Sequence, residues 1–367
     1  MTASRTRMRH PLVSIITPTY NHSGTIAACL RSVIAQSFTD WEQVVVDDGS
    51  RDETWNIMRS VAHDDARIHC VRQEHRGIGR LAETYNDALS KCRGRYVAII
   101  EGDDLWPADK LEHQVGIHAA DESLVLSHGR TLTYKDGAII GRYPEPPSVG
   151  RSDCHAYLRL ALLRRSCIMP VSVVISRDAL CSIGGFTQDE GLPAVDYPTW
   201  LRLFSREGHV WFDSKVLGYW RQSPSQATQQ YGLDLATAGL RVALNHFHSL
   251  PDTAKAVLRV SDGDLEKAHW ARDILPSTLV ALRRALMARK RREAIEHSLL
   301  MIRRGGPKRS IEGIAGLICA ALGWDLEGVF SAIDGLQRLG TFVNPTRPSG
   351  DMLLGREEEC HEERRKL

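Results

Sequence analysis

Residues 96–107 read Tyr-Val-Ala-Ile-Ile-Glu-Gly-Asp-Asp-Leu-Trp-Pro, and this stretch decides how the rest of the chain is interpreted. The run Tyr96–Ile100 is short, apolar and rich in β-branched residues, which is the pattern of a buried strand. It stops at three acids, Glu101, Asp103 and Asp104, and the glycine among them lets the backbone turn. The stretch therefore predicts a buried strand that ends in a cluster of carboxylates.

Carboxylates at the carboxyl end of a buried parallel strand lie where open α/β sheets bind their ligands. Asp103 and Asp104 are adjacent, and no Lys or Arg stands beside them in the sequence to offset their repulsion. Hard divalent cations take oxygen ligands of this kind and often share them with substrate phosphates. The sequence therefore suggests a metal–diphosphate site, with an acidic solvated turn as the alternative.

The first hundred residues alternate between strand and helix patterns. Strands are expected at Leu12–Thr17, Glu42–Val46, Arg67–Val71 and Tyr96–Ile100, with a helix after each of the first three. Such alternation indicates an α/β fold, with a Rossmann-like, mostly parallel sheet and helices on both faces. Polar or acidic residues follow three of these strands, so a shared site is expected at that edge of the sheet.

The second half of the chain is less regular and ends in helices. Helices are expected at 110–119, 153–164, 179–183 and 197–207, and strands at 124–127, 172–176, 210–212 and 216–219. Beyond about Gln222 the period is helical, and six helices between Asp234 and Leu339 predict an all-α C-terminal extension. The expected domains are a disordered N-terminus at 1–10, an α/β domain at 11–225, a helical domain at 226–343 and a disordered tail at 344–367.

Composition excludes several classes of protein. The 367 residues are 43% hydrophobic and 25% charged, as in an ordinary globular protein, and a net charge of +2 does not indicate a nucleic-acid binder. The eight cysteines form no CxxC pair, so a reducing cytoplasm fits best. We expect no membrane span and no signal peptide. Peripheral membrane contact stays open, because the basic cluster within 283–292 is either a solvated face or a site for anionic lipid or an acidic partner.

A second acidic motif, Asp47-Asp48-Gly49-Ser50, follows the second strand. It is either a simple turn, which Asp-Gly favours, or it places Asp48 to accept a hydrogen bond from a ligand amide. Residues 77–82 match the dinucleotide fingerprint G-x-G-x-x-A, but they do not come directly off the first strand, so we reject NAD binding. In the same loop, Arg76 and Arg80 suit phosphate oxygens or a sugar, with two solvated arginines as the alternative.

Asp196 stands between a Gly/Pro-containing loop and an aromatic helix. It is a helix N-cap or a general base, and the two roles are compatible. Asp189 and Glu190 in the preceding loop are rivals for the role of base. Trp106 and Trp200 flank the candidate acids, and they either stack on a sugar or pack in the core.

These motifs follow one another in a known order. The chain carries Val13–Asn21, Val44–Ser50, Glu101–Asp104, Gly184–Phe186 and Asp196. Together they closely resemble family 2 glycosyltransferases of the GT-A fold, over roughly residues 11–221. The resemblance implies an inverting enzyme that takes a sugar from a nucleotide diphosphate, usually UDP, with Mn²⁺ or Mg²⁺ as cofactor.

The resemblance also implies roles for single residues on the donor side. Pro18, Tyr20 and Asn21 would line the nucleoside pocket, and Asp48 would hydrogen-bond the base. Where the family often has an arginine, this chain has Tyr85, so Arg80 would substitute for it in binding the donor, with Arg76 nearby.

For the metal and the chemistry, the resemblance assigns four further positions. Asp103 would lie near the ribose and the metal, Asp104 would ligate the metal directly, and Asp196 would be the catalytic base. Gly185 and Phe186 would lie on the acceptor side, together with the two tryptophans.

Two departures and several alternatives remain open. Val195 replaces an acid that often precedes the base, and Gln222 replaces a late histidine. A catalytically degenerate scaffold and a sugar nucleotidyltransferase are the alternatives to a transferase. The acceptor is a natural product, a glycan, a lipid or a peptide, and the helical extension would shape its site or form a homodimer.

Overall fold

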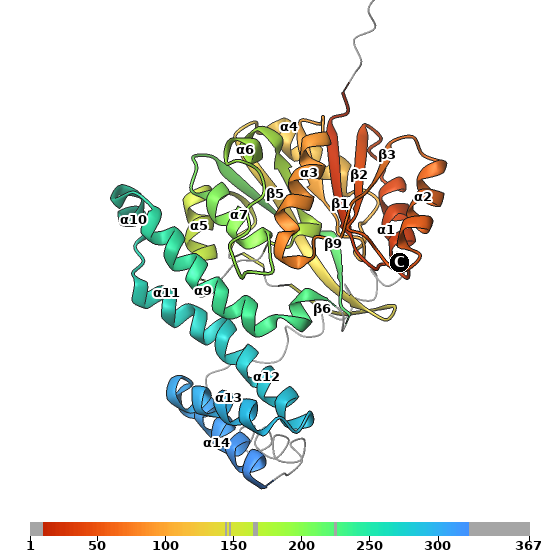
Figure 1. Ribbon diagram of the computed structural model, residues 1–367. Helices are drawn as coiled ribbons and strands as arrows, with labels where there is room; N and C mark the ends of the chain where they lie inside the picture. The colour runs from red at the N-terminus through yellow and green to blue at the C-terminus, as the bar shows by residue number, and fades with distance from the viewer. Residues whose placement is uncertain (1–9, 144, 147, 164–167, 224–225, 323–367) are drawn as a thin grey trace, which may run out of the picture. The chain divides into compact units, whose positions relative to one another are not determined.

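The computed structural model describes residues 10–143, 145–146, 148–163, 168–223 and 226–322 (Figure 1). The chain divides into two compact units, one of residues 1–230 with 242–260 and one of residues 231–241 with 261–367. The expected helix at 325–339, residues 1–9 of the N-terminus and the tail from 344 lie outside the described residues. The domain bounds expected from the sequence stay a prediction.

The described strands of the first unit form one nine-stranded sheet, in the order β3-β2-β1-β4-β8-β5-β9-β7 with β6 beside β5. Its parallel half contains β1 (Val13–Thr19), β2 (Trp41–Asp47), β3 (Ile68–Arg72) and β4 (Tyr96–Ile99). In this half Thr19 pairs with Asp47 and Asp47 pairs with Arg72, while Ile16 pairs with Ile99. The strand ends that carry the predicted motifs therefore come to one edge, as expected for parallel strands.

Helices cover both faces of this half. Neighbouring residues of a strand point to opposite faces of the sheet, so each face has its own set of side chains for a helix to contact. Val13 and Ile15 of β1 pack in the core with Ile26 and Leu30 of α1, whereas the Ser14 hydroxyl between them accepts from the Gly94 N–H after α3 at 2.8 Å. The helices are α1 (Ile26–Ile34), α2 (Thr54–His63), α3 (Leu81–Lys91) and α4 (Lys110–Ala120). The predicted α/β fold is confirmed.

The other half of the sheet is mixed. Strand β8 (Val174–Ser176) is antiparallel to β4 and to β5 (Leu124–Lys135), β9 (His209–Arg221) is parallel to β5, and β6 (Ala138–Arg142) and β7 (Gly150–Asp153) are antiparallel edge strands. The sequence predicts two short strands where β9 is a single strand of 13 residues. The cause is an irregularity in the pairing of β5 with β9, beside the polar residue Asp213, whose carboxylate accepts from the Lys215 N–H.

Short helices complete the first unit. Aromatic and aliphatic side chains of α7, including Trp200 and Phe204, are fully buried and account for its helical pattern. These elements are η1 (Ile78–Arg80), α5 (Cys154–Leu162), η2 (Pro170–Ser172), α6 (Arg177–Ser182), α7 (Asp196–Phe204), α8 (Ala227–Gln230) and α10 (Asp252–Leu258), and α9 (Gly232–Ser249) has residues in both units.

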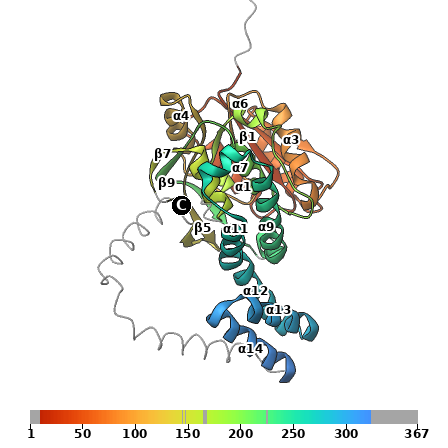
Figure 2. The same cartoon turned by 90° about the vertical axis from the view of Figure 1, so that its left-hand side faces the viewer.

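The second unit is helical, as predicted. Its elements are α11 (Asp262–His269), a π-helical turn (Trp270–Ile274), α12 (Leu275–Met287), α13 (Arg291–Arg304) and α14 (Gly306–Leu322). Helices α12, α13 and α14 lie side by side around buried Leu282, Met301 and Cys319 (Figure 2). Among the described helices, none combines the length and the apolar character that a membrane span requires.

Candidate active site

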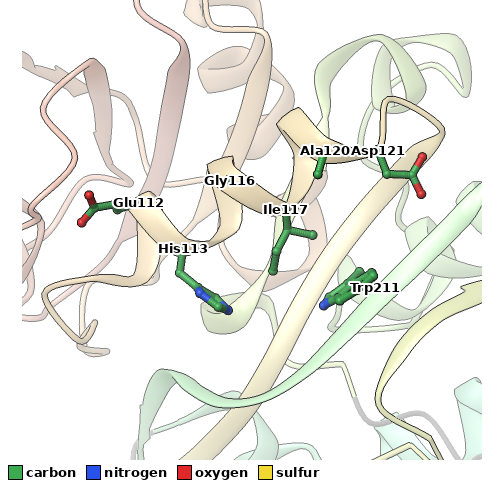
Figure 3. Close-up of a pocket in the computed structure, with 7 residues that line it drawn as sticks. All are labelled: Glu112, His113, Gly116, Ile117, Ala120, Asp121 and Trp211. Carbon is green, nitrogen blue, oxygen red and sulfur yellow. The ribbon is translucent and has the colours of Figure 1, made fainter.

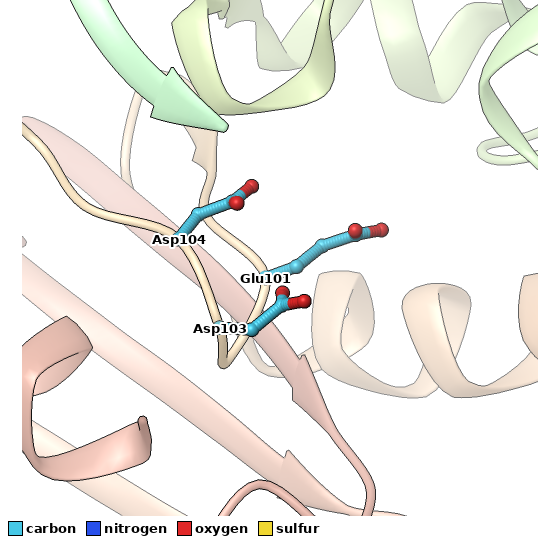
Figure 4. Close-up of side chains that lie close together, drawn as sticks. All are labelled: Glu101, Asp103 and Asp104. Atoms are coloured by element: carbon cyan, nitrogen blue, oxygen red, sulfur yellow. The ribbon is translucent and has the colours of Figure 1, made fainter. Parts of the chain in front are cut away.

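Three carboxylates converge directly after β4, and their oxygen atoms lie within 4.8 Å of one another (Figure 4). They belong to Glu101, Asp103 and Asp104, the acids that the sequence places at the end of this strand. Asp103 and Asp104 are 8% and 2% exposed. Because these two carboxylates are shielded from water, the observation argues against the alternative of an acidic solvated turn.

Gly102 allows this loop to pack against the end of β1. Its N–H donates to the Pro18 carbonyl at 3.1 Å, and the Thr25 hydroxyl donates to its carbonyl at 3.1 Å. A Cβ at this position would lie 2.5 Å from Thr19 Oγ1 and 2.7 Å from His22 Nδ1. The close approach, and not an unusual backbone angle, explains why a glycine separates the acids.

The electrostatics of the cluster are those of a site short of positive charge. Burial, and then the charges of Asp103 and Glu101, raise the pKa of Asp104 well above its ordinary value. Burial and the Asp103 charge raise the pKa of Glu101 to about 7, although the Tyr85 hydroxyl donates to it at 2.8 Å. A set of carboxylate oxygens that repel one another this strongly fits a hard divalent cation.

The end of β9 reaches back to the same loop. The backbone N–H of Arg221 donates to Asp104 Oδ1 at 2.9 Å, and its Nε donates to the Asp103 carbonyl at 2.7 Å. Gln226 Nε2 donates to Asp103 Oδ2 at 2.9 Å. No Lys or Arg stands beside these acids in the sequence, but a residue 117 positions away brings its guanidinium to the acidic loop.

Sequence reasoning missed Arg221, Gln226 and the contact between Tyr85 and Glu101. Gln222, which stands where the family often has a histidine, donates its backbone N–H to the Tyr134 carbonyl at 2.8 Å. No local pattern in the sequence marks Arg221, because only the folded sheet brings the end of β9 to the acidic loop.

The Asp48 carboxylate organises the loop after β3. It accepts hydrogen bonds from Gln73 Nε2 at 2.7 Å and from the backbone N–H groups of Arg76 and Gly77 at 2.9 and 3.0 Å. His75 Nδ1 lies 3.0 Å from the same carboxylate. Asp48 is thus more than a turn residue, because it holds residues 73–77 beside the ends of β1 and β2.

The expected nucleoside residues lie at the same edge. The Tyr20 ring stacks on the His75 ring, with centroids 4.1 Å apart and planes at 20°. Asn21 has a φ of 54°, its N–H donates to Ser50 Oγ, and its side chain accepts from the Arg51 N–H. Pro18 pairs with Val46 in the sheet. These contacts bring Pro18, Tyr20, Asn21 and Asp48 together at one end of the strands.

The two candidate phosphate-binding arginines form ion pairs in the structure. Arg76 contacts Asp87 at 2.7 Å, and Arg80 contacts Glu83 at 2.6 Å with 61% of its side chain exposed. Binding of a donor phosphate by either guanidinium would have to compete with these pairs.

Asp196 is the first residue of α7, and Val195 occupies the N-cap position. The alternative that Asp196 is the N-cap is therefore wrong. Its charge raises the pKa of both Glu101 and Tyr85, so it lies near the acidic cluster. Strands β1, β2 and β4 and helix α7 thus bring the separate acidic motifs to a common region.

Of the four residues expected on the acceptor side, three are buried: Trp106, Trp200 and Phe186. Trp106 is 4% exposed and donates from Nε1 to the Val171 carbonyl at 2.7 Å, and Trp200 is 1% exposed. Neither ring is available to stack on a sugar. Phe186 exchanges two hydrogen bonds of 2.8 Å with the Asn86 side chain and lies against the Tyr85 ring, and Gly185 packs closely on the same asparagine.

A separate cavity of about 570 Å³ lies beside α4 and β9 (Figure 3). Its lining includes His113 and Trp211, and His113 Nε2 lies 2.8 Å from Asp213 Oδ2. The residues that line it do not include the predicted site residues. We place the site at the acidic cluster, because the cavity brings together no such set of ligand oxygens.

Residues 14–179 match the family model described as glycosyl transferase family 2, and the chain belongs to this family. It is 32% identical over 197 residues to TuaG of Bacillus subtilis (strain 168), a glycosyltransferase named for teichuronic acid biosynthesis, covering 53% of this chain and 73% of that protein. It is 30% identical over 195 residues to WfaP of Escherichia coli, a UDP-Glc:alpha-D-GlcNAc-diphosphoundecaprenol beta-1,3-glucosyltransferase, covering 53% of this chain and 71% of WfaP.

A solved structure gives the same fold. The crystal structure of S. aureus TarS 1–349 in complex with UDP-GlcNAc superposes with a TM-score of 0.59 at 16% identity, over 85% of this chain and 87% of that one. The predicted GT-A fold, family and class of enzyme are confirmed, and the protein is a glycosyltransferase.

Proposed function

We propose that the protein is an inverting glycosyltransferase that takes a sugar from a UDP-linked donor with the help of Mn²⁺ or Mg²⁺. The observation that carries this proposal is the convergence of three carboxylates, those of buried Asp103 and Asp104 and of half-buried Glu101, together with the effect of the Asp196 charge on Glu101. The names of WfaP and of the TarS complex support a UDP-linked donor, since both contain one.

Asp104 and Asp103 would hold the metal ion, with Glu101 as a third oxygen donor. When bound, the ion supplies charge that stabilises the departing diphosphate. The role of Arg221 follows from its contacts: it fixes Asp104 through its backbone N–H and the loop through its guanidinium. The first of these hydrogen bonds orients the Asp104 carboxylate before the ion arrives, and the second holds the backbone of the loop at Asp103.

Asp196 would be the catalytic base. The acceptor oxygen forms a bond to the anomeric carbon as the bond from that carbon to the diphosphate breaks, and the acceptor proton passes to the Asp196 carboxylate. One displacement inverts the anomeric carbon and requires no enzyme nucleophile.

On the donor side, Tyr20 and Asp48 would contact the uracil base, with Pro18 and Asn21 beside them. The stacked rings of Tyr20 and His75 provide a flat apolar surface for a base. The Asp48 carboxylate already accepts three N–H donors, which fixes its orientation before the donor binds. The relative WfaP acts on a lipid-linked sugar diphosphate, so acceptors of that class belong with glycans, peptides and natural products in a screen.

Calorimetry with UDP and Mn²⁺ tests the proposal directly. The wild-type protein should bind UDP more tightly with Mn²⁺, and Asp104→Ala should lose this dependence on the metal. Asp109→Ala is a matched control, because Asp109 is an exposed acid paired with Lys215. Binding of neither ligand by the wild-type protein would favour a degenerate scaffold. A screen of nucleotide sugars for hydrolysis, read by mass spectrometry, would then identify the sugar.

A further inference from the structure

The turn between α12 and α13 concentrates positive charge in a chain that is otherwise nearly neutral. Residues 283–292 contain six basic residues and no acid, and residues 261–322 contain twelve Lys or Arg against seven Asp or Glu, a net charge of +5. The chain as a whole has +2. We call the exposed basic residues of this segment the basic turn: Arg283, Arg284, Arg289, Lys290, Arg291 and Arg292.

The basic turn has a defined backbone. The N–H groups of Arg289 and Lys290 donate to the Leu286 and Ala285 carbonyls at 3.0 and 2.8 Å, and Arg289 adopts a left-handed φ of 56°. Lys290 and Arg292 pair with acids of α13, but these pairs are exposed and contribute little. The charges are therefore held close together, where their potentials add.

Apolar side chains are exposed on the same helix. Met287 is 67% exposed and Val280 is 48% exposed, although Leu282 and Ala285 of α12 are buried. Positions 280, 283, 284 and 287 have the spacing of one helix face, so two arginines stand between the two apolar side chains. A helix face that presents both cations and exposed apolar groups can contact the phosphate head groups and the acyl boundary of a membrane surface together.

We propose that this face of α12 and the basic turn bind an anionic phospholipid surface. Phosphate head groups would meet the basic residues, and Met287 and Val280 would enter the boundary with the acyl chains. The two apolar side chains favour a lipid surface over a nucleic acid, which would offer them no apolar partner. The inference goes beyond the proposed function and does not depend on it.

Cosedimentation of the full chain with vesicles tests this inference. Vesicles of phosphatidylcholine with phosphatidylglycerol should bind the protein at low salt and release it at high salt, and vesicles of phosphatidylcholine alone should bind it weakly. Replacing Arg289, Lys290, Arg291 and Arg292 by Gln should weaken binding at least about tenfold, given the attraction of each basic residue to an anionic leaflet. The matched control replaces the exposed residues Arg31, Arg59, Lys91 and Lys135 by Gln and should bind as the wild type does.

Met287→Ser separates a lipid surface from a plain polyanion. It should weaken vesicle binding severalfold without changing the circular dichroism spectrum or the binding of UDP. Ile314→Ser, on the exposed apolar side of α14, should leave vesicle binding unchanged. The inference is overturned if anionic vesicles do not bind, if the two sets of Gln variants behave alike, or if a DNA duplex binds as tightly as the vesicles and Met287→Ser has no effect.

Discussion

Replacing Gly102 by Ala should displace the loop of the candidate metal site by steric overlap alone. The added Cβ would lie 2.5 Å from Thr19 Oγ1 and 2.7 Å from His22 Nδ1, about 1 Å inside a normal contact. Thr19 is 3% exposed and its hydroxyl lies 3.1 Å from His22 Nδ1, so the loop has to move or this contact has to break. We expect a loss of about 1–3 kcal/mol in the free energy of unfolding.

The displaced loop carries Asp103 and Asp104, so Mn²⁺ affinity should fall as well. Gly116→Ala is the matched control, since, apart from its chain neighbours and the backbone of its own helix, no described heavy atom lies within 4 Å of the Cβ it would add. Gly116 is inside α4, where alanine should stabilise the protein by about 0.5–1 kcal/mol. Denaturant unfolding and Mn²⁺ calorimetry measure both quantities. Equal stability and equal Mn²⁺ affinity of Gly102→Ala and wild type would refute the reasoning.

Three further predictions follow from the site. Asp196→Asn should lower kcat by about 10²–10⁴-fold and leave UDP binding intact, measured by steady-state kinetics and calorimetry, and near-normal turnover would exclude this base. Mn²⁺ affinity should fall by up to about tenfold as pH drops from about 8 to 6, because Glu101, with a pKa of about 7, must lose its proton to bind the ion. The folded pKa of Glu101 is raised, so its contribution to the stability of the metal-free protein is present at low pH and is lost as pH rises through about 7. A pH-independent Mn²⁺ affinity would contradict this assignment. Trp106→Phe should cost about 1–3 kcal/mol of stability, because it leaves the Val171 carbonyl without its donor, and should leave the KM for the acceptor unchanged; a raised KM would return Trp106 to the acceptor side.

The central strands of the parallel half could be predicted because they are buried on both faces and are rich in apolar residues. Every residue of β1 and β2 is buried, and both strands appear in the sequence nearly as the structure has them. Strands β5 and β9 were expected to be much shorter. They continue through polar residues such as Arg130 and Asp213, which interrupt the apolar pattern and lie where the register shifts, although the two strands pair on both sides of the shift.

The β5–β6 hairpin had a signal that was overlooked. Asp136-Gly137 connects the two strands, and both residues have positive φ, as the tight turns of hairpins require. The contacts of Arg221 and Gln226 with the acidic loop had no such local signal. They join residues 117 and 123 positions apart, and only the folded sheet brings them together.

Burial also decided between two interpretations that the sequence left open. Trp106 and Trp200 stand beside the candidate acids in the sequence, and this proximity favoured a sugar-binding role as much as a core position. The direction in which a side chain leaves the backbone depends on which elements pack around it, and here those elements enclose both rings. Proximity in sequence to a catalytic motif is therefore weak evidence for contact with a ligand.

The backbone pairing of Leu105 with Tyr219, at 3.1 and 2.9 Å, has a consequence for fragments of this enzyme. The match to the family model ends at residue 179. Strand β9, which pairs with the acidic loop, and helix α7, which carries Asp196, both come later in the chain. A fragment that ends at residue 179 would keep the sequence that matches the family model. It would lose the contacts from β9 that orient the acidic loop with Asp103 and Asp104. The minimal catalytic fragment should therefore extend at least through Gln226, whose amide holds Asp103.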